Sequence, residues 1–543
     1  MTKYDTAAKG ELYGAYTYKD GAVHDSVTYP VLDADNDYKP TSTKYYLSPT
    51  AEPELCGTYE FNTQYNADGT VQGQNFPAAG GLSGEAVSYQ YDSLQRPTAL
   101  NSSLGGGSYV SKTAYSPTNQ LEQLELNTGG ASDKKTWLTY SYEQGTKQLN
   151  NSRVDVEGAT SVAYDADYTY DAGGNVQSIV DNPTGGTRDT QCFAYDNLRR
   201  MTDDWTSSVA PDGAIGTGST DAACKSAASS TTVGGVAPYW HHYDYDATGN
   251  RTAETDHGID GSATSTKTYT YGENGEGPHQ LTKVVTDTTA TPTTPAVTSQ
   301  DTYSYDAAGN TDTRVLDGDT QTLAWDKQND LTKVTNADGS ESSYVYDAAG
   351  SRLLRKAPSE TTFYLPGMEL HLNKSTKAVT ATRYYSLGGQ TVAVRDSGGV
   401  TFLAGDNHGT AQLAINAVTG QTQRRRLDPF GEGRDSASSD NSKWVNDKGF
   451  VGGSNDDTSG LVNLGAREYD ASTGRFISAD PIVDYTDPQQ VNGYAYSYNN
   501  PVTFSDPDGL KPAECDEPGM TCRVNDGEAS TSIRRPIGTS GAA

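Results

Sequence analysis

The sequence predicts an all-β fold, and three observations lead to this prediction. Short segments with alternating side chains recur along most of the chain, and each ends in turn residues. The 543 residues include 37 Tyr and 57 Gly but only 9 Phe, and 34% are apolar, which favours thin, partly hydrated sheets over a thick apolar core. Thr, Val and Tyr favour strands, and Gly with Asn or Asp favours the turns between them. No segment shows the periodicity of a long helix.

The recurring segment has the form Tyr-x-Tyr-Asp-x-x-Gly-Asn/Arg and is followed by a second alternating stretch. Copies begin at Tyr89, Tyr168, Phe193, Tyr243, Tyr303, Leu323 and Tyr344. Tyr-x-Tyr places two rings on one face of a strand, because strand side chains alternate. The Asp can accept backbone N–H groups two residues further on, and Gly adopts a left-handed turn without penalty. Each unit is therefore predicted to be a β-hairpin.

Repeated hairpins are expected to join edge to edge, because a single hairpin is barely stable alone. Cross-strand aromatic pairs would contribute about 0.2–1 kcal/mol each, and the natural twist of strands would make a long sheet coil. Two interpretations of the tyrosines stay open. They form either a structural ladder or an aromatic platform for carbohydrate, with Tyr245 and Tyr305 among the contacting rings.

The charge of the chain argues against partners that need a basic surface. With 40 Lys and Arg against 70 Asp and Glu, the net charge is −30, which disfavours nucleic acids and anionic membranes. The one basic run, Arg424–Arg426, is expected on a solvated face. No apolar run approaches the roughly 18 residues of a membrane helix. The first residues lack the apolar region of a secretory signal, so we expect no membrane insertion and no signal-directed export.

Cofactor and metal chemistry finds no support in the sequence. The five Cys include no C-x-x-C pair, although Cys515 and Cys522 could form a local bridge in an oxidising compartment. The seven His are scattered, and no matching Glu or His spacing makes His408 part of a metal or Ser/His site. We therefore expect no cofactor and no bound metal.

A different, non-repeating pattern begins near residue 360. Its densest part comprises Leu464-Gly465-Ala466-Arg467-x-Tyr469-Asp470, Gly474-Arg475-Phe476, Asp480-Pro481, Asn499-Asn500-Pro501-Val502 and Asp506-Pro507-x-Gly509-Leu510. Together with the Tyr-Asp repeats, this run resembles the Rhs, or YD-repeat, family and its Rhs-associated core domain. The same modules occur in the C components of Tc toxins and in bacterial polymorphic toxins. The resemblance covers most of the chain.

The resemblance implies a domain organisation and a fold. Residues 1–84 would be a β-rich segment of degenerate repeats, 85–360 the YD repeats, 361–510 the core domain and 511–543 a short tail. The hairpins would wind into a large hollow β-shell, complete or partial, and the core would plug one end. Family members hold a C-terminal toxic domain inside the shell. The tail is too short to bury a core, so we expect that domain to be absent, lost or encoded elsewhere, and the chain to be a piece of a longer protein or a degenerate copy.

The resemblance also implies self-cleavage. The essential aspartates of the family fall on Asp480 and Asp506, its essential arginine on Arg467, and the cleaved bond on Leu510–Lys511. Two carboxylates held close together do not both ionise easily, so one could activate water while the other polarises the carbonyl. Arg467 could orient a carboxylate or stabilise the oxyanion. The residues alone leave another interpretation open, because Asp-Pro is also a common turn opening.

Two functions follow from these observations. The first is the encapsulating shell of a bacterial Rhs-type toxin, which cuts its own chain once after Leu510 and has no free substrate. The second is a non-catalytic YD-repeat surface protein, structural or adhesive, with carbohydrate binding as a variant. Expected partners are the chain's own C-terminal segment as cargo, an export machine or second shell component, and an immunity protein only if a toxin domain exists. The expected location is the bacterial surface or exterior, by an unidentified route.

Overall fold

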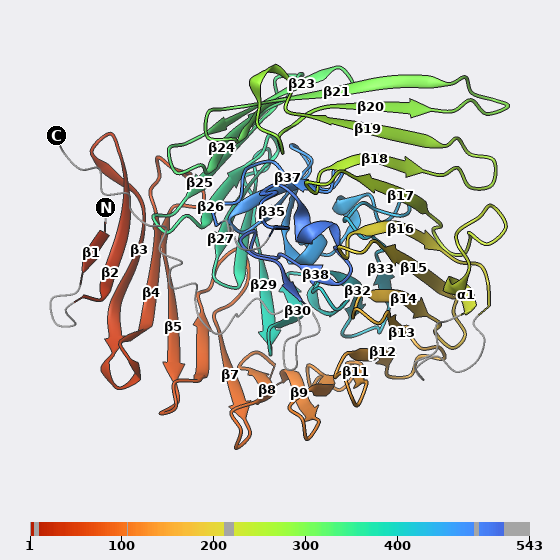
Figure 1. Cartoon of the computed structure of the whole chain (residues 1–543). Coiled ribbons are helices and arrows are strands. Elements are labelled where there is room, and N and C mark those ends of the chain that lie inside the picture. The colour runs from red at the N-terminus through yellow and green to blue at the C-terminus, as the bar shows by residue number, and fades with distance from the viewer. Residues whose placement is uncertain (1, 5–9, 106, 211–221, 483–487, 515–543) are drawn as a thin grey trace.

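The computed structural model describes residues 2–4, 10–105, 107–210, 222–482 and 488–514 (Figure 1). The all-β prediction is confirmed, since the one α-helix in these ranges is the four-residue α1 (Ala222–Lys225). Short 3-10 turns are η1 (Ala34–Asn36), η2 (Glu273–Gly275), η3 (Asn441–Lys443), η4 (Phe450–Gly452) and η5 (Tyr496–Asn499). Within the described ranges, no helix has the length and apolar character needed to cross a bilayer.

Among the described residues, the large sheet consists of 33 strands. Its first part comprises β1 (Thr2–Tyr4), β2 (Leu12–Lys19), β3 (Ala22–Asp33), β4 (Lys39–Leu47), β5 (Gly57–Tyr65), β6 (Val71–Phe76), β7 (Glu85–Tyr91), β8 (Pro97–Ser102), β9 (Ser108–Tyr115), β10 (Leu121–Leu126), β11 (Thr136–Tyr142), β12 (Leu149–Val156), β13 (Tyr164–Tyr170), β14 (Val176–Asp181), β15 (Asp189–Tyr195) and β16 (Met201–Thr206). It continues with β17 (Trp240–Tyr245), β18 (Arg251–Asp256), β19 (Ser265–Tyr271), β20 (Leu281–Thr288), β21 (Val297–Tyr305), β22 (Thr311–Leu316), β23 (Asp319–Trp325), β24 (Leu331–Thr335), β25 (Glu341–Tyr346), β26 (Arg352–Lys356), β27 (Glu360–Leu365), β28 (Met368–Asn373), β29 (Val379–Leu387), β30 (Gln390–Asp396), β31 (Gly399–Gly405), β32 (Ala411–Asn416) and β33 (Thr422–Arg424).

Each of these strands pairs antiparallel with the next one in sequence, which confirms that the repeats form hairpins joined edge to edge. The sheet continues without a break through residue 360, where the sequence pattern changes, as far as Arg424. Beyond it lie a second sheet of β34 (Ser454–Asp456), β35 (Leu461–Leu464), β36 (Arg467–Asp470) and β37 (Arg475–Phe476), and the pair β38 (Phe504–Ser505) and β39 (Ala513–Glu514).

The turn of each repeat is formed as its sequence suggests. In the hairpin of β17 and β18, Asp246 Oδ1 accepts the N–H groups of Thr248 at 2.8 Å and Asn250 at 3.0 Å. Gly249 takes a φ of +86°, a conformation in which a side chain would be strained. The amide of Asn250 returns a hydrogen bond to Asp246 Oδ2 at 2.9 Å. The Asp, Gly and Asn of the repeat therefore build one closed turn.

The second tyrosine of each repeat has a role that depends on its hydroxyl. Tyr245 lies at a bulge at the end of β17, and its hydroxyl donates to the carbonyl of Met201, the first residue of β16, at 2.8 Å. The same bond, to the first residues of the preceding strand, recurs for Tyr65, Tyr91, Tyr115, Tyr142, Tyr170, Tyr195, Tyr271, Tyr305 and Tyr346. These bonds link each hairpin to the one before it. Phe could not form them, which accounts for the preference for Tyr.

The sheet coils so that early strands pack face to face on late ones. Tyr109 of β9 stacks on Tyr385 of β29 with ring centroids 3.7 Å apart. Beside them, the buried carboxylate of Glu85 pairs with Arg383 Nη1 at 3.0 Å and accepts the hydroxyls of both tyrosines. Figure 1 shows the same curvature, with the large sheet sweeping around the blue C-terminal segment that carries β35, β37 and β38.

The C-terminal segment is attached to the turns of the repeats. Asn492 donates to the carbonyl of Gly249 at 3.1 Å, and the hydroxyl of Tyr494 donates to that of Gly309 at 2.7 Å. A buried ion pair joins Arg314 of β22 to Asp470 of β36 at 2.8 Å. The glycines of the Asp-x-x-Gly turns thus offer carbonyl groups that hold the segment in place.

The prediction that Arg424–Arg426 lie on a solvated face is wrong. Arg425 is 3% exposed, and its guanidinium donates to the Lys448 and Ala411 carbonyls. Segments distant in sequence supply the partners, since Arg424 pairs with Asp181, Arg426 pairs with Asp189, and Ser438 and Lys448 accept hydrogen bonds from Arg426 and Arg425.

The cysteines also differ from expectation in one respect. Cys192 of β15 and Cys224 of α1 form a disulfide that the sequence analysis did not identify. Its partners are 32 residues apart in the sequence, and they meet because α1 lies against β15. Cys515 and Cys522 lie outside the described residues, so their bridge stays a prediction.

Candidate active site

A tight turn between β35 and β36 prepares the place where the site forms. Gly465 has a φ of +59°, and a Cβ on it would lie 2.7 Å from the carbonyl oxygen of Asp508. The next N–H, of Ala466, donates to that same oxygen at 2.9 Å. The absence of a side chain at Gly465 therefore lets residues 506–510 lie directly against the start of β36. Arg467 is the first residue of that strand.

Asp506 is buried in this contact and is hydrogen-bonded through both carboxylate oxygens. Its Oδ2 pairs with Arg467 Nη2 at 3.0 Å. Its Oδ1 accepts the N–H of Leu510 at 2.9 Å and the N–H of Lys511 at 3.1 Å. Its own N–H donates to the hydroxyl of Tyr496 at 3.2 Å. The predicted catalytic carboxylate thus contacts the nitrogen of the predicted scissile bond.

Asp480 approaches the same arginine from another side. Its Oδ2 lies 3.1 Å from Arg467 Nη2, and its Oδ1 accepts the N–H of Ile482 at 2.7 Å. The carbonyl of Gly493 fixes both residues, since it accepts from the Asp480 N–H at 3.0 Å and from Arg467 Nη1 at 2.9 Å. The side chain of Asp480 is 14% exposed, against 1% for Asp506, so Asp480 is the carboxylate nearer to water.

Arg467 lies between the two carboxylates rather than beside a touching pair. Its planar face packs on Phe476 at 3.6 Å from the ring centroid, and its Nε donates to the carbonyl of Gly509 at 2.5 Å. The structure therefore brings Asp480, Asp506 and Arg467 together, but the aspartates meet through Nη2 of the arginine. A single guanidinium holds both carboxylates and the chain next to the bond.

Burial sets the protonation of the site. It raises the pKa of Asp506 to about 7, with Arg467 opposing the rise and Asp508 adding to it. Burial also raises the pKa of Asp480, again against the effect of Arg467. Burial lowers the pKa of the Arg467 guanidinium, against the charges of its two carboxylates. Near neutral pH, Asp506 is therefore able to carry a proton beside Lys511.

The predicted scissile bond lies in a turn between two paired strands. β38 pairs with β39 in the register Phe504–Glu514 and Ser505–Ala513. In the connection, Gly509 has a φ of +68°, and a Cβ there would lie 2.4 Å from the carbonyl oxygen of Leu464. Leu510 is half-buried and Lys511 is exposed, so the bond is at the boundary between the site and solvent.

Several residues that contact the site were not predicted from the sequence. Asp508, the variable position of the Asp-Pro-x-Gly-Leu run, directs its Oδ1 to the N–H of Leu510 at 3.1 Å. Tyr496 and Gly493 act through a hydroxyl and a backbone carbonyl, respectively. Only the two-residue spacing of Asp506 and Asp508 was available as a signal, because the other contacts depend on how the segment folds.

His408 and clusters of metal-ligating side chains are two further candidate features. His408 is buried, and its Nε2 lies 2.5 Å from the carbonyl oxygen of Val502, which gives it a structural contact. In the described ranges, no group of three or more His, Cys, Asp or Glu side chains is arranged to hold a metal ion.

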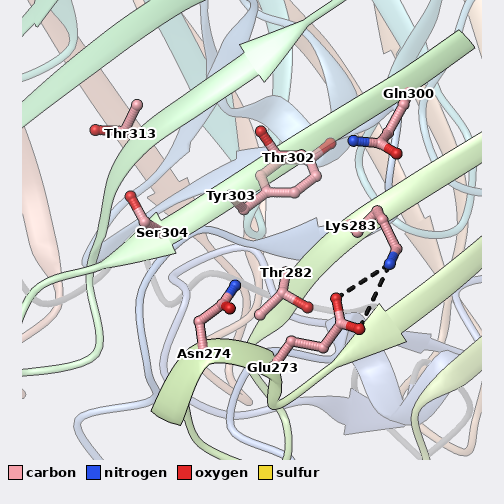
Figure 2. A pocket seen from close by; sticks show the side chains of 9 residues that line it. All are labelled: Glu273, Asn274, Thr282, Lys283, Gln300, Thr302, Tyr303, Ser304 and Thr313. Carbon is pink, nitrogen blue, oxygen red and sulfur yellow. Dashed lines mark hydrogen bonds and ion pairs between the residues drawn. The ribbon is translucent and has the colours of Figure 1, made fainter.

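A polar pocket on the large sheet lies over β20, β21 and β22 and does not include the aspartates (Figure 2). Its lining residues are Glu273, Asn274, Thr282, Lys283, Gln300, Thr302, Tyr303, Ser304 and Thr313. Lys283 and Glu273 form an ion pair at 3.1 Å across it. Tyr245 and Tyr305, the rings considered for carbohydrate, do not line this pocket and use their hydroxyls within the sheet.

Comparison with known proteins identifies a matching family and related proteins. Residues 229–502 match the family described as Teneurin YD-shell. The chain is 27% identical over 419 residues to the tRNA3(Ser)-specific nuclease WapA of Bacillus spizizenii, covering 70% of this chain and 16% of that protein. It is 25% identical over 527 residues to the toxin subunit YenC1 of Yersinia entomophaga, covering 86% of this chain and 50% of that protein. The chain thus spans half or less of the length of these relatives.

Solved structures agree on the fold. The TcdB2-TccC3-TEV crystal structure superimposes with a TM-score of 0.63 at 20% identity, covering 94% of this chain and 26% of that one. The Photorhabdus luminescens Tc holotoxin pore gives a TM-score of 0.63 at 19% identity, with the same coverage. The resemblance to the Rhs and Tc toxin shells is therefore confirmed at the level of family and fold. Because the family match extends over half of the sequence, the chain belongs to the YD-shell family.

Proposed function

We propose that this chain is the encapsulating shell of a bacterial Rhs-type toxin and that it cuts its own backbone once, after Leu510. The observation that carries the proposal is the position of Asp506. Its carboxylate contacts the nitrogen of Lys511 at 3.1 Å and shares Arg467 Nη2 with a second, more exposed carboxylate, Asp480. An acid at the leaving nitrogen and a base open to water are the two groups that peptide hydrolysis requires.

The proposed reaction uses one water molecule. Its oxygen attacks the carbonyl carbon of Leu510 while its proton passes to the Asp480 carboxylate. Asp506 gives its proton to the nitrogen of Lys511 as the carbon–nitrogen bond breaks, which leaves a carboxyl group on Leu510 and an amine on Lys511. Arg467 stays charged and stabilises the carboxylate that Asp506 becomes. Because the substrate is part of the same chain, no binding step is needed.

The neighbouring peptide bond makes similar contacts and has to be distinguished. Asp506 Oδ1 also accepts the N–H of Leu510 at 2.9 Å, and Arg467 Nε donates to the carbonyl of Gly509 at 2.5 Å. The family resemblance supports a cut after Leu510, and Lys511 is exposed whereas Leu510 is half-buried, which favours release of the Lys511 amine to solvent. The intact mass of the product separates the two bonds, because the products differ by one leucine.

The test is an intact-mass measurement of the parent chain beside Asp480→Asn and Asp506→Asn. Asp428→Asn is a matched control, because Asp428 also precedes a proline and accepts N–H groups of its own turn. Loss of residues 511–543 from the parent and the control, but not from the two site variants, supports the proposal. A folded parent that stays uncut would contradict it and favour the non-catalytic structural or adhesive protein.

The proposal extends to organisation and partners. We propose residues 1–84, 85–360, 361–510 and 511–543 as the functional divisions, with the C-terminal segment as cargo. A second shell component is a proposed partner, since TccC3 is found with TcdB2 in the similar structures. The proposed location is the bacterial surface or exterior, which fractionation of producing cells would test.

A further inference from the structure

We propose that Asp508 is a third carboxylate of the cleavage site, a positioning residue that keeps the proton of Asp506 in place beside Lys511. This inference rests on the proposed self-cleavage and extends it to a residue outside the aspartate pair. Asp508 occupies the x of the Asp-Pro-x-Gly-Leu run, where the motif itself specifies no residue.

Two carboxylates converge on one backbone donor. The N–H of Leu510 is shared between Asp506 Oδ1 at 2.9 Å and Asp508 Oδ1 at 3.1 Å. Two carboxylates so close to one atom are near enough to share a proton, and two such groups do not both ionise easily. Asp506 and Asp508 are therefore linked through one backbone N–H, whereas Asp480 and Asp506 are linked through the guanidinium of Arg467.

The backbone of Asp508 is fixed, so this convergence does not depend on a loose loop. Its carbonyl oxygen accepts the N–H of Ala466 at 2.9 Å. A Cβ on Gly465 would lie 2.7 Å from the same oxygen. The residue that follows, Gly509, is itself enclosed by Leu464 and Arg467. The carboxylate of Asp508 is nevertheless exposed, so it connects the buried Asp506 to solvent.

The site carries more negative than positive charge, so a bound proton would stabilise it. The charges of three carboxylates, of Asp480, Asp506 and Asp508, act on the guanidinium of Arg467. Among the described residues, Arg467 forms ion pairs with Asp480 and Asp506 only. The charge of Asp508 and its hydrogen bond with Asp506 both raise the pKa of Asp506. A proton held on Asp506 and directed at Asp508 relieves the excess negative charge, and it lies next to the nitrogen that must be protonated when the bond breaks.

The test measures the pH dependence of cleavage. The parent, Asp508→Asn and Asp508→Glu are synthesised in a short cell-free pulse and diluted into buffers between pH 5 and 9, and the loss of residues 511–543 is followed by mass. The parent is expected to give a bell-shaped profile whose alkaline limb reports Asp506, with a midpoint near its pKa of about 7. Asp508→Asn removes a negative charge and offers an amide donor, which favours the ionised form of Asp506.

For Asp508→Asn we expect the whole profile to move to lower pH, because the charge of Asp508 raises the pKa of Asp480 as well. A shift of the alkaline limb by one unit lowers the rate about tenfold above pH 7.5 and leaves the maximum nearly unchanged. Asp508→Glu should restore the parent profile. An Asp508→Asn profile that coincides with the parent's, or one lowered equally at every pH, would overturn the inference while the proposed function stands. A parent that is uncut at every pH would overturn both.

Discussion

Asp506 Oδ1 accepts the backbone N–H of Lys511 at 3.1 Å, so that a buried acid faces the nitrogen on the far side of the predicted cleavage bond. The contact exists because β38 and β39 fold the chain back on itself, and because Arg467 anchors Asp506 from the opposite side. A turn-forming aspartate would need only the N–H groups of its own turn. Here the same carboxylate also forms a buried ion pair with Arg467. Asp506 is therefore part of a site as well as part of a turn.

Arg467→Lys should abolish most cleavage while the sheet remains folded. Lysine supplies a point charge but cannot bridge two carboxylates and two carbonyls in one plane, as Arg467 does with Asp480, Asp506, Gly493 and Gly509. We expect the rate to fall by about 10²-fold or more, the usual effect of losing a preorganised charged donor at a reacting site. The fraction of cut chain over time measures it. Arg153→Lys, on a half-exposed arginine, should change nothing, and equal rates for both variants would refute the role of Arg467.

Gly465→Ala should slow cleavage through the position of the loop rather than through chemistry. A methyl group there would meet the carbonyl of Asp508 at 2.7 Å and push the Asp506 loop away from β36. Gly460→Ala is a matched control, because Gly460 also has a positive φ, of +72°, but nothing lies within 4 Å of its Cβ. Each variant should lose about 1–2 kcal/mol of stability from backbone strain. Only Gly465→Ala should cut more slowly, and similar cleavage by both would argue against the loop contact.

Tyr245→Phe should cost about 0.5–1.5 kcal/mol of stability, because it removes only the hydroxyl that bonds the Met201 carbonyl. Adding Tyr305→Phe should produce a further loss of similar size, since the two tyrosines serve different hairpins. Denaturant unfolding followed by tyrosine fluorescence measures both. Tyr18→Phe is the control, because Tyr18 is 46% exposed and should tolerate the change. Losses no larger than that of Tyr18→Phe would refute the proposed role of these hydroxyls.

Stability should decrease as pH rises through the range in which His241 titrates. Burial alone would lower the pKa of His241, but the charge of Asp204, whose Oδ1 lies 3.2 Å away, and the hydrogen bond to it raise the pKa to about 10. The pKa of His in the unfolded chain is about 6.5. The stability that protonated His241 contributes is therefore complete below about pH 6.5 and is lost as pH approaches about 10. The difference in melting temperature between the parent and His241→Gln should therefore narrow from pH 6 to pH 10. A difference independent of pH would show that His241 acts through packing alone.

The local parts of the fold were readable from the sequence because their chemistry is local. Asp246, Gly249 and Asn250 lie within five residues and form their turn with one another. The residues of one repeat are therefore enough to predict its hairpin. The hydroxyl bond of Tyr245 was not foreseen, since its partner lies 44 residues earlier. The burial of Arg425 depends in the same way on a later segment that covers it.

The candidate site was predicted only in part, and the prediction came from the family resemblance. The resemblance selected Asp480, Asp506 and Arg467, and these three residues lie together in the structure. Arg467 and Asp506 are 39 residues apart in the sequence. It could not tell that the guanidinium would lie between the aspartates or that Asp508 would share a donor with Asp506. Both relationships depend on how Gly465 admits the loop against β36, which is a matter of packing.

Arg383→Met should destabilise the coiled sheet strongly, by about 3–5 kcal/mol, because it leaves the carboxylate of Glu85 buried without its cation. Both side chains are fully buried, and 298 residues separate them, so the pair joins an early strand to a late one. The double variant Glu85→Gln with Arg383→Met removes the unpaired charge and should recover part of the loss. Denaturant unfolding of the parent, the two single variants and the double variant gives the coupling energy. A coupling near zero would mean that the ion pair adds no stability and that other contacts between the early and late strands, such as the stack of Tyr109 on Tyr385, hold them together.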